Sequence, residues 1–174
     1  MSTPGAPGGV LWDTMFASRL RPTRPELLAA AIAARGTDHE PLLGAPVVSE
    51  VVYGLRKGAG VDARCAALAV WWEGHILAGP NRLRVVLPGV QALVVAARVL
   101  ALQPTSPAKA NKKDGRKIPE RRLSWCRDVE LVALGATCGL PVATGNLSDF
   151  GPIGALLHRV APGLAIQLVD APFA

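Results

Sequence analysis

Two acidic residues directly follow, or nearly follow, apolar segments of the kind that form buried strands. Asp13 comes immediately after the apolar residues 10–12, and Glu50 follows the apolar residues 46–48 with one serine between them. In open α/β sheets, ligands bind outside the carboxyl ends of the strands. We therefore expect both carboxylates to lie at that edge of a sheet, with Ser49 capping a helix that begins at Glu50.

Two further acids are placed near a third expected strand, residues 141–144. Asp149 lies in the loop expected after that strand, and Asp128 lies in the first turn of the helix expected before it. That end of the helix can face the same edge of the sheet. Four carboxylates from distant parts of the chain are thus predicted to converge on one pocket.

Convergent carboxylates repel one another, and such a cluster persists when a hard divalent cation neutralises it. Mg²⁺ or Mn²⁺ held by carboxylates, with several waters retained, suits phosphodiester hydrolysis. The histidines His39, His75 and His158 lie outside these segments and are not expected to be catalytic. Each acid alone also has an ordinary interpretation as a cap or turn former, so the prediction depends on the four occurring together.

The elements that would position these acids are short apolar strands alternating with helices. This alternation is typical of a three-layer α/β/α sandwich with a mainly parallel sheet. The first helix begins with a capping box from Thr23 to Glu26 and stops at Gly36. The strands are expected at residues 10–12, 46–48, 83–87, 141–144 and 164–169, and the later helices at 50–58, 62–77, 88–102, 125–137 and 153–160.

The positive charge of the chain is concentrated in one segment. The formal net charge is +6, and residues 109–127 contain eight basic and two acidic residues, whereas the rest of the chain has eleven of each. Residues 103–122 have almost no apolar character, which predicts an exposed insert that binds RNA phosphates or is merely a solvated loop. The predicted RNA-binding residues are Lys112, Lys113, Arg116, Lys117, Arg121 and Arg122.

Other features bound the class of protein. Cys65, Cys126 and Cys138 form no CxxC pair, which argues against a disulfide framework or a zinc site. The apolar stretch 85–102 is interrupted by Pro88, Gln91 and Arg98 and is not expected to span a membrane. No signal peptide is recognisable, so we expect a cytoplasmic protein with a loose tail at residues 1–9 and one domain over residues 10–174.

Four segments, in order along the chain, resemble the motifs of VapC-type PIN-domain proteins. The stretch LWDTMFAS at 11–18, followed by Leu-Arg-Pro, is similar to the first motif, and VVSEVVYGL at 47–55 is similar to the second. Asp128 with LVALGAT at 131–137 resembles the third motif, and GLPVATGNLSDF at 139–150 resembles the last. Met15 departs from the pattern, since the family has Asn there, and the basic insert is longer than usual.

The resemblance implies a parallel α/β/α PIN fold and an endoribonuclease dependent on Mg²⁺ or Mn²⁺. It implies the toxin half of a VapBC-like toxin–antitoxin pair, with a cognate antitoxin and a homodimer as partners. By the same resemblance, Asp13, Glu50 and Asp128 occupy the three core acidic positions, while either Asn146 or Asp149 occupies the fourth. Thr14 and Thr144 are expected to donate hydrogen bonds to a carboxylate, a water or a phosphate.

Two alternatives compete with this interpretation. A PIN-fold protein that binds nucleic acid without catalysis is favoured by Met15. A phosphoacceptor domain like a response regulator also uses acids at strand ends. It normally needs paired acids at the first strand and a late lysine, whereas here Asp13 is alone and no lysine follows Lys117.

Overall fold

The protein is described by a computed structural model covering residues 8–107 and 118–170. The predicted tail falls almost entirely outside these residues. Lys112, Lys113, Arg116 and Lys117 also lie outside them, so their predicted RNA-binding role stays a prediction.

A five-stranded sheet forms the centre of the molecule, with the order β3-β2-β1-β4-β5 and all neighbours parallel. From β1 the chain builds β2 and β3 on one side and later adds β4 and β5 on the other. The strand order therefore reverses beside β1, and such a switch point opens a crevice at the carboxyl ends of β1 and β4. The strands are β1 (Val10–Trp12), β2 (Pro41–Gly44), β3 (Arg84–Val86), β4 (Val142–Ala143) and β5 (Leu168–Val169).

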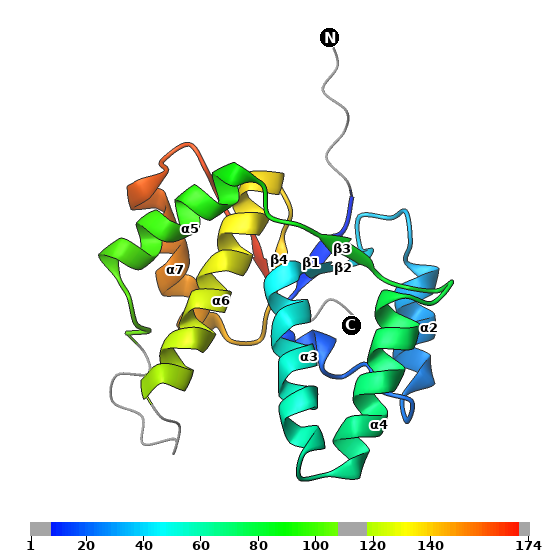
Figure 1. Ribbon diagram of the computed structural model, residues 1–174. Coiled ribbons are helices and arrows are strands. Elements are labelled where there is room, and N and C mark those ends of the chain that lie inside the picture. Colours follow the sequence, from blue (N-terminus) through cyan, green and yellow to red (C-terminus); the bar gives the residue numbers. More distant parts are fainter. Residues whose placement is uncertain (1–7, 108–117, 171–174) are drawn as a thin grey trace.

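Helices cover the sheet and complete a three-layer α/β/α architecture, which confirms the predicted fold class. Figure 1 shows α5, α6 and α7 together on one side of the molecule and α2, α3 and α4 together on the other. The helices are α1 (Thr14–Ala17), α2 (Pro25–Ala33), α3 (Ala45–Ala59), α4 (Ala63–Trp71) continuing as the π-helix η1 (Trp72–Leu77), α5 (Val90–Leu102), α6 (Ile118–Cys138) and α7 (Leu147–Val160).

The second strand lies earlier than predicted. Residues 46–48 belong to the first turn of α3, and the strand is formed instead by Pro41–Gly44. A short apolar run cannot be assigned to a strand or a buried helix from periodicity alone. Gly44 is the last residue of the strand and packs closely on α6, since a Cβ there would lie 2.7 Å from Leu131 Cδ1. The prediction that Ser49 caps the helix is therefore wrong, and Glu50 lies inside α3.

Three other helix starts differ from the prediction. Arg24 precedes α2 and no side chain caps that helix, so the capping box at Thr23 is wrong. Helix α6 begins at Ile118, before Ser124, which places Asp128 in mid-helix and not in a first turn. Helix α7 begins at Leu147, so Asp149 lies in its first turn and not in a loop.

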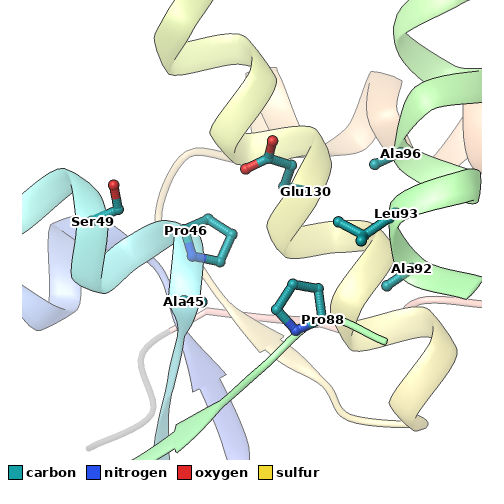
Figure 2. A pocket seen from close by; sticks show the side chains of 8 residues that line it. All are labelled: Ala45, Pro46, Ser49, Pro88, Ala92, Leu93, Ala96 and Glu130. Carbon is teal, nitrogen blue, oxygen red and sulfur yellow. The ribbon is translucent and has the colours of Figure 1, made fainter. Parts of the chain in front are cut away.

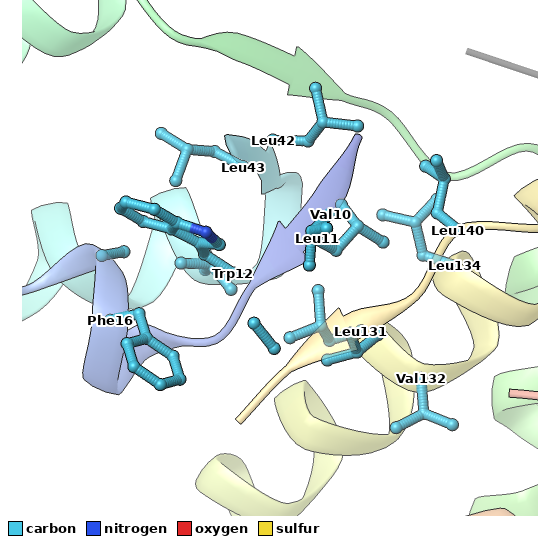
Figure 3. Close-up of a cluster of buried hydrophobic side chains, with 14 of the residues drawn as sticks. Val10, Leu11, Trp12, Phe16, Leu42, Leu43, Leu131, Val132, Leu134 and Leu140 are labelled. Carbon is cyan, nitrogen blue, oxygen red and sulfur yellow. The ribbon is translucent and has the colours of Figure 1, made fainter. Parts of the chain in front are cut away.

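The core lies between the sheet and helix α6. Leu11, Leu42 and Leu134 are completely buried, and Figure 3 shows side chains of β1 and β2 gathered with those of α6. Truncating a leucine in such a core costs about 2–5 kcal/mol of stability. This packing fixes the position of β1, and hence of the residue that follows it.

The sequence argued against a disulfide framework and against a membrane-spanning segment, and both concern residues that the structure describes. All three cysteines are free and half-buried. Over residues 8–107 and 118–170, no helix combines the length and the apolar character that crossing a bilayer requires.

Candidate functional site

Asp13 stands where the strand order reverses. It directly follows β1, its backbone N–H donates to the carbonyl of Ala143 (N···O 3.0 Å), and its side chain is only 5% exposed. Its carboxylate caps α1 by accepting the backbone N–H of Phe16 at 3.0 Å. Burial raises the pKa of Asp13, although hydrogen bonds from Thr144 and the α1 backbone and the charge of Arg19 act in the opposite direction. A bound cation would favour the ionised form.

Glu50 reaches the same region from α3. Its carboxylate accepts a hydrogen bond of 2.7 Å from the Thr14 hydroxyl, one residue after Asp13. The guanidinium of Arg127, on α6, lies 3.9 Å from the other Glu50 oxygen and 5.7 Å from the centre of the Tyr53 ring. Helices α1, α3 and α6 therefore meet around Glu50.

The end of β4 carries a second set of polar side chains. Thr144 is completely buried, its hydroxyl accepts the backbone N–H of Asn146 at 3.0 Å, and the same side chain lowers the pKa of Asp13. Asp149 is 2% exposed and accepts hydrogen bonds from the Asn146 side-chain amide (2.6 Å) and the Ser106 hydroxyl (2.8 Å). Hydrogen bonds thus link Ser106 to Thr144 through Asp149 and Asn146.

Asp128 is half-buried on α6, next to Arg127. Because Arg127 reaches Glu50, this part of α6 faces the region where α1 and α3 meet. Hydrogen bonds connect Asp149, Asn146 and Thr144, the side chain of Thr144 lowers the pKa of Asp13, and a further hydrogen bond joins Glu50 to Thr14. Asp128 directly follows Arg127 in α6.

The arrangement of these residues can be compared with what a bound metal ion requires. Among the residues that the structure describes, no three His, Cys, Asp or Glu side chains lie close enough to hold one. Mg²⁺ is usually bound through one or two carboxylates and keeps several waters or substrate phosphates as ligands. Asp13 and Glu50 fit such an open site, but not an all-protein cage. The four-acid metal site remains a prediction.

Met15, the departure from the family pattern, covers the loop after β4. Its side chain occupies the space beside Gly145, where an added Cβ would collide with the Met15 methyl group. Met15 is 39% exposed. It therefore forms a partly open apolar edge between the ends of β1 and β4, in place of a polar amide.

Two residues of the site carry no signal in the sequence. Ser106 belongs to the predicted exposed insert, yet it is 4% exposed and bonded to Asp149. The carbonyl of Gln103 accepts the indole N–H of Trp125, so the beginning of the insert is attached to α6. Arg127 is the other residue, since the sequence places it in the basic segment and not at the site. Only tertiary contacts distinguish these residues from ordinary linker and surface residues.

Two pockets of similar size flank α3. One, of about 240 Å³, lies between α3, α5 and α6, and none of the predicted catalytic acids lines it (Figure 2). Glu130 lines it, and burial raises the pKa of that carboxyl. The other, of about 230 Å³, is lined by Thr14 and Glu50. The second pocket therefore opens on the candidate site.

Comparisons with known proteins support the fold. No protein-family model matches the sequence, and no curated protein matches it. One chain of the DNA-bound VapBC complex from Salmonella typhimurium matches with a TM-score of 0.51 at 17% identity, covering 94% of this chain and 98% of that one. One chain of FitAcB from Neisseria gonorrhoeae matches with 0.53 at 20%, covering 94% and 98%. One chain of VapBC2 from Rickettsia felis, bound to a promoter DNA fragment, matches with 0.52 at 12%, covering 92% and 98%.

These matches extend over nearly the whole of each chain, at identities that establish the fold alone. The PIN-like fold expected from the four motifs is therefore confirmed.

Proposed function

We propose that this chain is an endoribonuclease dependent on Mg²⁺ or Mn²⁺ and the toxin of a VapBC-like toxin–antitoxin pair. The observation that carries the proposal is the buried carboxylate of Asp13 at the switch point, with the Thr14–Glu50 pair beside it. The fold shared with chains of VapBC and FitAB complexes supports it. RNA as substrate comes from the motif resemblance.

Asp13, Glu50 and Asp128 are the residues proposed to hold the metal. When bound, a divalent ion would activate water and neutralise charge on the scissile phosphate. Thr14 holds Glu50 through its hydroxyl, and the charge of Arg127 offsets repulsion around Glu50. Thr144 donates to Asp13 and orients its carboxylate.

Asp149 and Asn146 are proposed to support the site and not to bind the metal. Both oxygens of Asp149 already accept hydrogen bonds from Ser106 and Asn146, and the carboxylate is buried. Asn146 in turn donates its backbone N–H to Thr144. Their effect on Asp13 is therefore exerted through Thr144.

An antitoxin and a second copy of the chain are the proposed protein partners. The structural matches are to chains of two-component VapBC and FitAB complexes, which supports an antitoxin. Helix α5 leaves Val90, Leu93 and Val94 exposed, an apolar face suited to a homodimer; of the three, Leu93 lines the pocket of Figure 2. Light scattering at micromolar concentration should give the mass of a dimer, and a strict monomer would contradict this part.

Metal removal tests the activity. Purified protein with Mn²⁺ should cleave single-stranded or structured RNA, and complete chelation with EDTA should abolish cleavage, because Asp13 and Glu50 need a cation to act on phosphate. Re-addition of Mn²⁺ should restore the rate, which controls for irreversible unfolding. Full activity after chelation would contradict the metal-dependent mechanism.

The second candidate function is nucleic-acid binding without catalysis. Met15 favours it, because the similar motif has a polar amide at the position of Met15. Here the apolar Met15 side chain packs on Gly145 instead. Such a protein would bind RNA with the same affinity after Asp13→Asn and would cleave nothing at any Mn²⁺ concentration. Cleavage that requires Asp13 excludes it.

A further inference from the structure

Three arginines follow helix α1 within seven residues of its end. Arg19, Arg21 and Arg24 are all exposed and lie in the link between α1 and α2. In the part of the chain that the structure describes, none of the three forms an ion pair with a carboxylate. Their charges are therefore available to an anionic ligand.

The arginines line an open hollow of about 610 Å³, together with Ser18 and Thr23, and no acidic residue among those that the structure describes lines it. The Arg19 guanidinium lies 4.9 Å from the centre of the Phe16 ring, and Arg21 Nε donates to the Ser18 carbonyl at 3.2 Å. Two of the cations are thus held in place by the protein. Planar guanidinium groups present several N–H donors that match the oxygens of a phosphate.

The hollow continues into the 230 Å³ pocket beside the candidate site. Ser18 and Arg21 line both. The pocket walls are mainly apolar, including Leu68 and Trp72, and at its other side stand Thr14 and Glu50. The charge of Arg19 is also felt by Asp13, because it lowers that pKa. A cationic surface, an apolar pocket and the candidate catalytic acids are therefore contiguous.

We propose that the hollow and the pocket form one nucleotide-binding subsite: the arginines bind phosphates of a single-stranded RNA, and the pocket takes one unpaired base beside the cleaved bond. The identity of the ligand as RNA rests on the proposed function. An acidic protein segment would pair with the arginines but would leave the apolar pocket unused. A nucleotide also uses the apolar pocket, and places its phosphate next to Thr14 and Glu50. Unstacked bases bound on apolar or aromatic surfaces are the usual mode of single-strand recognition.

The first test measures RNA binding in EDTA, where cleavage does not interfere. The triple variant Arg19→Gln, Arg21→Gln, Arg24→Gln should bind a fluorescent single-stranded RNA at least about tenfold more weakly. The slope of log affinity against log salt should become shallower by about 0.7 for each phosphate that the variant no longer binds. The matched control is Arg82→Gln, Arg98→Gln, Arg159→Gln, which removes the same charge from exposed arginines outside the hollow. The control should change affinity and slope much less.

The second test fills the pocket without a clash. Gly54 lines the pocket on α3, and a Cβ added there meets no atom within 4 Å, so Gly54→Leu should fold and obstruct the pocket. Gly151, on α7, is equally open, and Gly151→Leu is the matched control. Gly54→Leu should weaken RNA binding by about tenfold, the value of one base contact. Thermal melting of each variant confirms that it is folded.

The outcomes separate this inference from the proposed function. Equal reductions of RNA affinity in the two arginine triples, or RNA affinity unchanged by Gly54→Leu, would overturn the subsite. If the Arg19, Arg21, Arg24 triple variant bound an acidic peptide more weakly but kept its RNA affinity, the subsite would also be overturned. The hollow would then be assigned to a protein partner. Wild-type protein that binds RNA through these residues, yet never cleaves it with Mn²⁺, would retain the subsite and contradict the nuclease.

Discussion

Asp13 and Asp149 are both buried carboxylates near the ends of neighbouring parallel strands, but their surroundings differ. Asp13 accepts hydrogen bonds mostly within its own turn and lies beside the Thr14–Glu50 pair and the charge of Arg19. Asp149 joins Ser106, far along the chain, to Asn146. Position at a strand end therefore does not by itself identify a catalytic acid, because one such acid faces charged groups and the other connects segments of the fold.

The largest expected effect separates the two acids by activity. Asp13→Asn should lower the RNA cleavage rate by at least about a hundredfold, because it removes a charge placed to hold a cation. The folded state should not be destabilised, since burial disfavours the ionised form of Asp13. Single-turnover kinetics at saturating Mn²⁺, together with urea unfolding, measure both. A variant with near-wild-type rate would remove Asp13 from the site.

Stability separates them in the opposite direction. Asp149→Ala should lower the free energy of unfolding by about 2–4 kcal/mol, because the buried Ser106 hydroxyl and Asn146 amide lose their acceptor. Urea denaturation measures the change. An inactive Asp149→Ala protein with wild-type stability and weaker Mn²⁺ binding would show instead that Asp149 is a ligand.

The pH dependence of stability sharpens the contrast. The folded-state pKa of Asp13 is raised, so as pH rises above about 3.8 the unfolded chain loses this proton before the folded protein does. Ionisation of Asp13 therefore lowers the stability of the metal-free protein through that window, up to its folded pKa. Asp13→Asn removes this effect, so its stability relative to wild type should increase with pH. Unfolding free energies in EDTA from about pH 4 to 7 give the difference, and a difference that decreases with pH would contradict the assigned sign.

The smallest effect concerns one hydroxyl. Ser106→Ala should cost about 1–2 kcal/mol of stability, because it removes a buried hydrogen bond to a carboxylate. Ser148→Ala is the matched control, since its hydroxyl donates to Asn146 Oδ1 at an exposed position and its removal should cost less than about 0.5 kcal/mol. Equal effects in chemical denaturation would indicate that the Ser106–Asp149 bond contributes little.

The sequence predicted the elements whose signals are local. The apolar run 10–12, the acid after it and the helix entered at Asp62 all appear where the pattern indicated them. The placement of β2 failed because a run of leucines and valines satisfies a strand and a buried helix equally well.

The connections of the site could not be predicted in the same way. The bond between Ser106 and Asp149 depends on how the beginning of the insert packs on α6. Arg127 approaches Glu50 only because α3 and α6 pack together. Such contacts join residues far apart in the chain, and no local pattern encodes them.

The central position of β1 has a consequence for the timing of synthesis. Among the five strands of the described sheet β1 comes first in the chain, yet it pairs on one side with β4, the fourth. A nascent chain has Asp13 and Glu50 early but lacks the partner strand that leads to Thr144 until β4 has been made. Pairings so distant in the chain form late and slowly. The site therefore stays incomplete until β4 has been made, and a chain terminated before β4 exposes one edge of β1 without assembling the crevice.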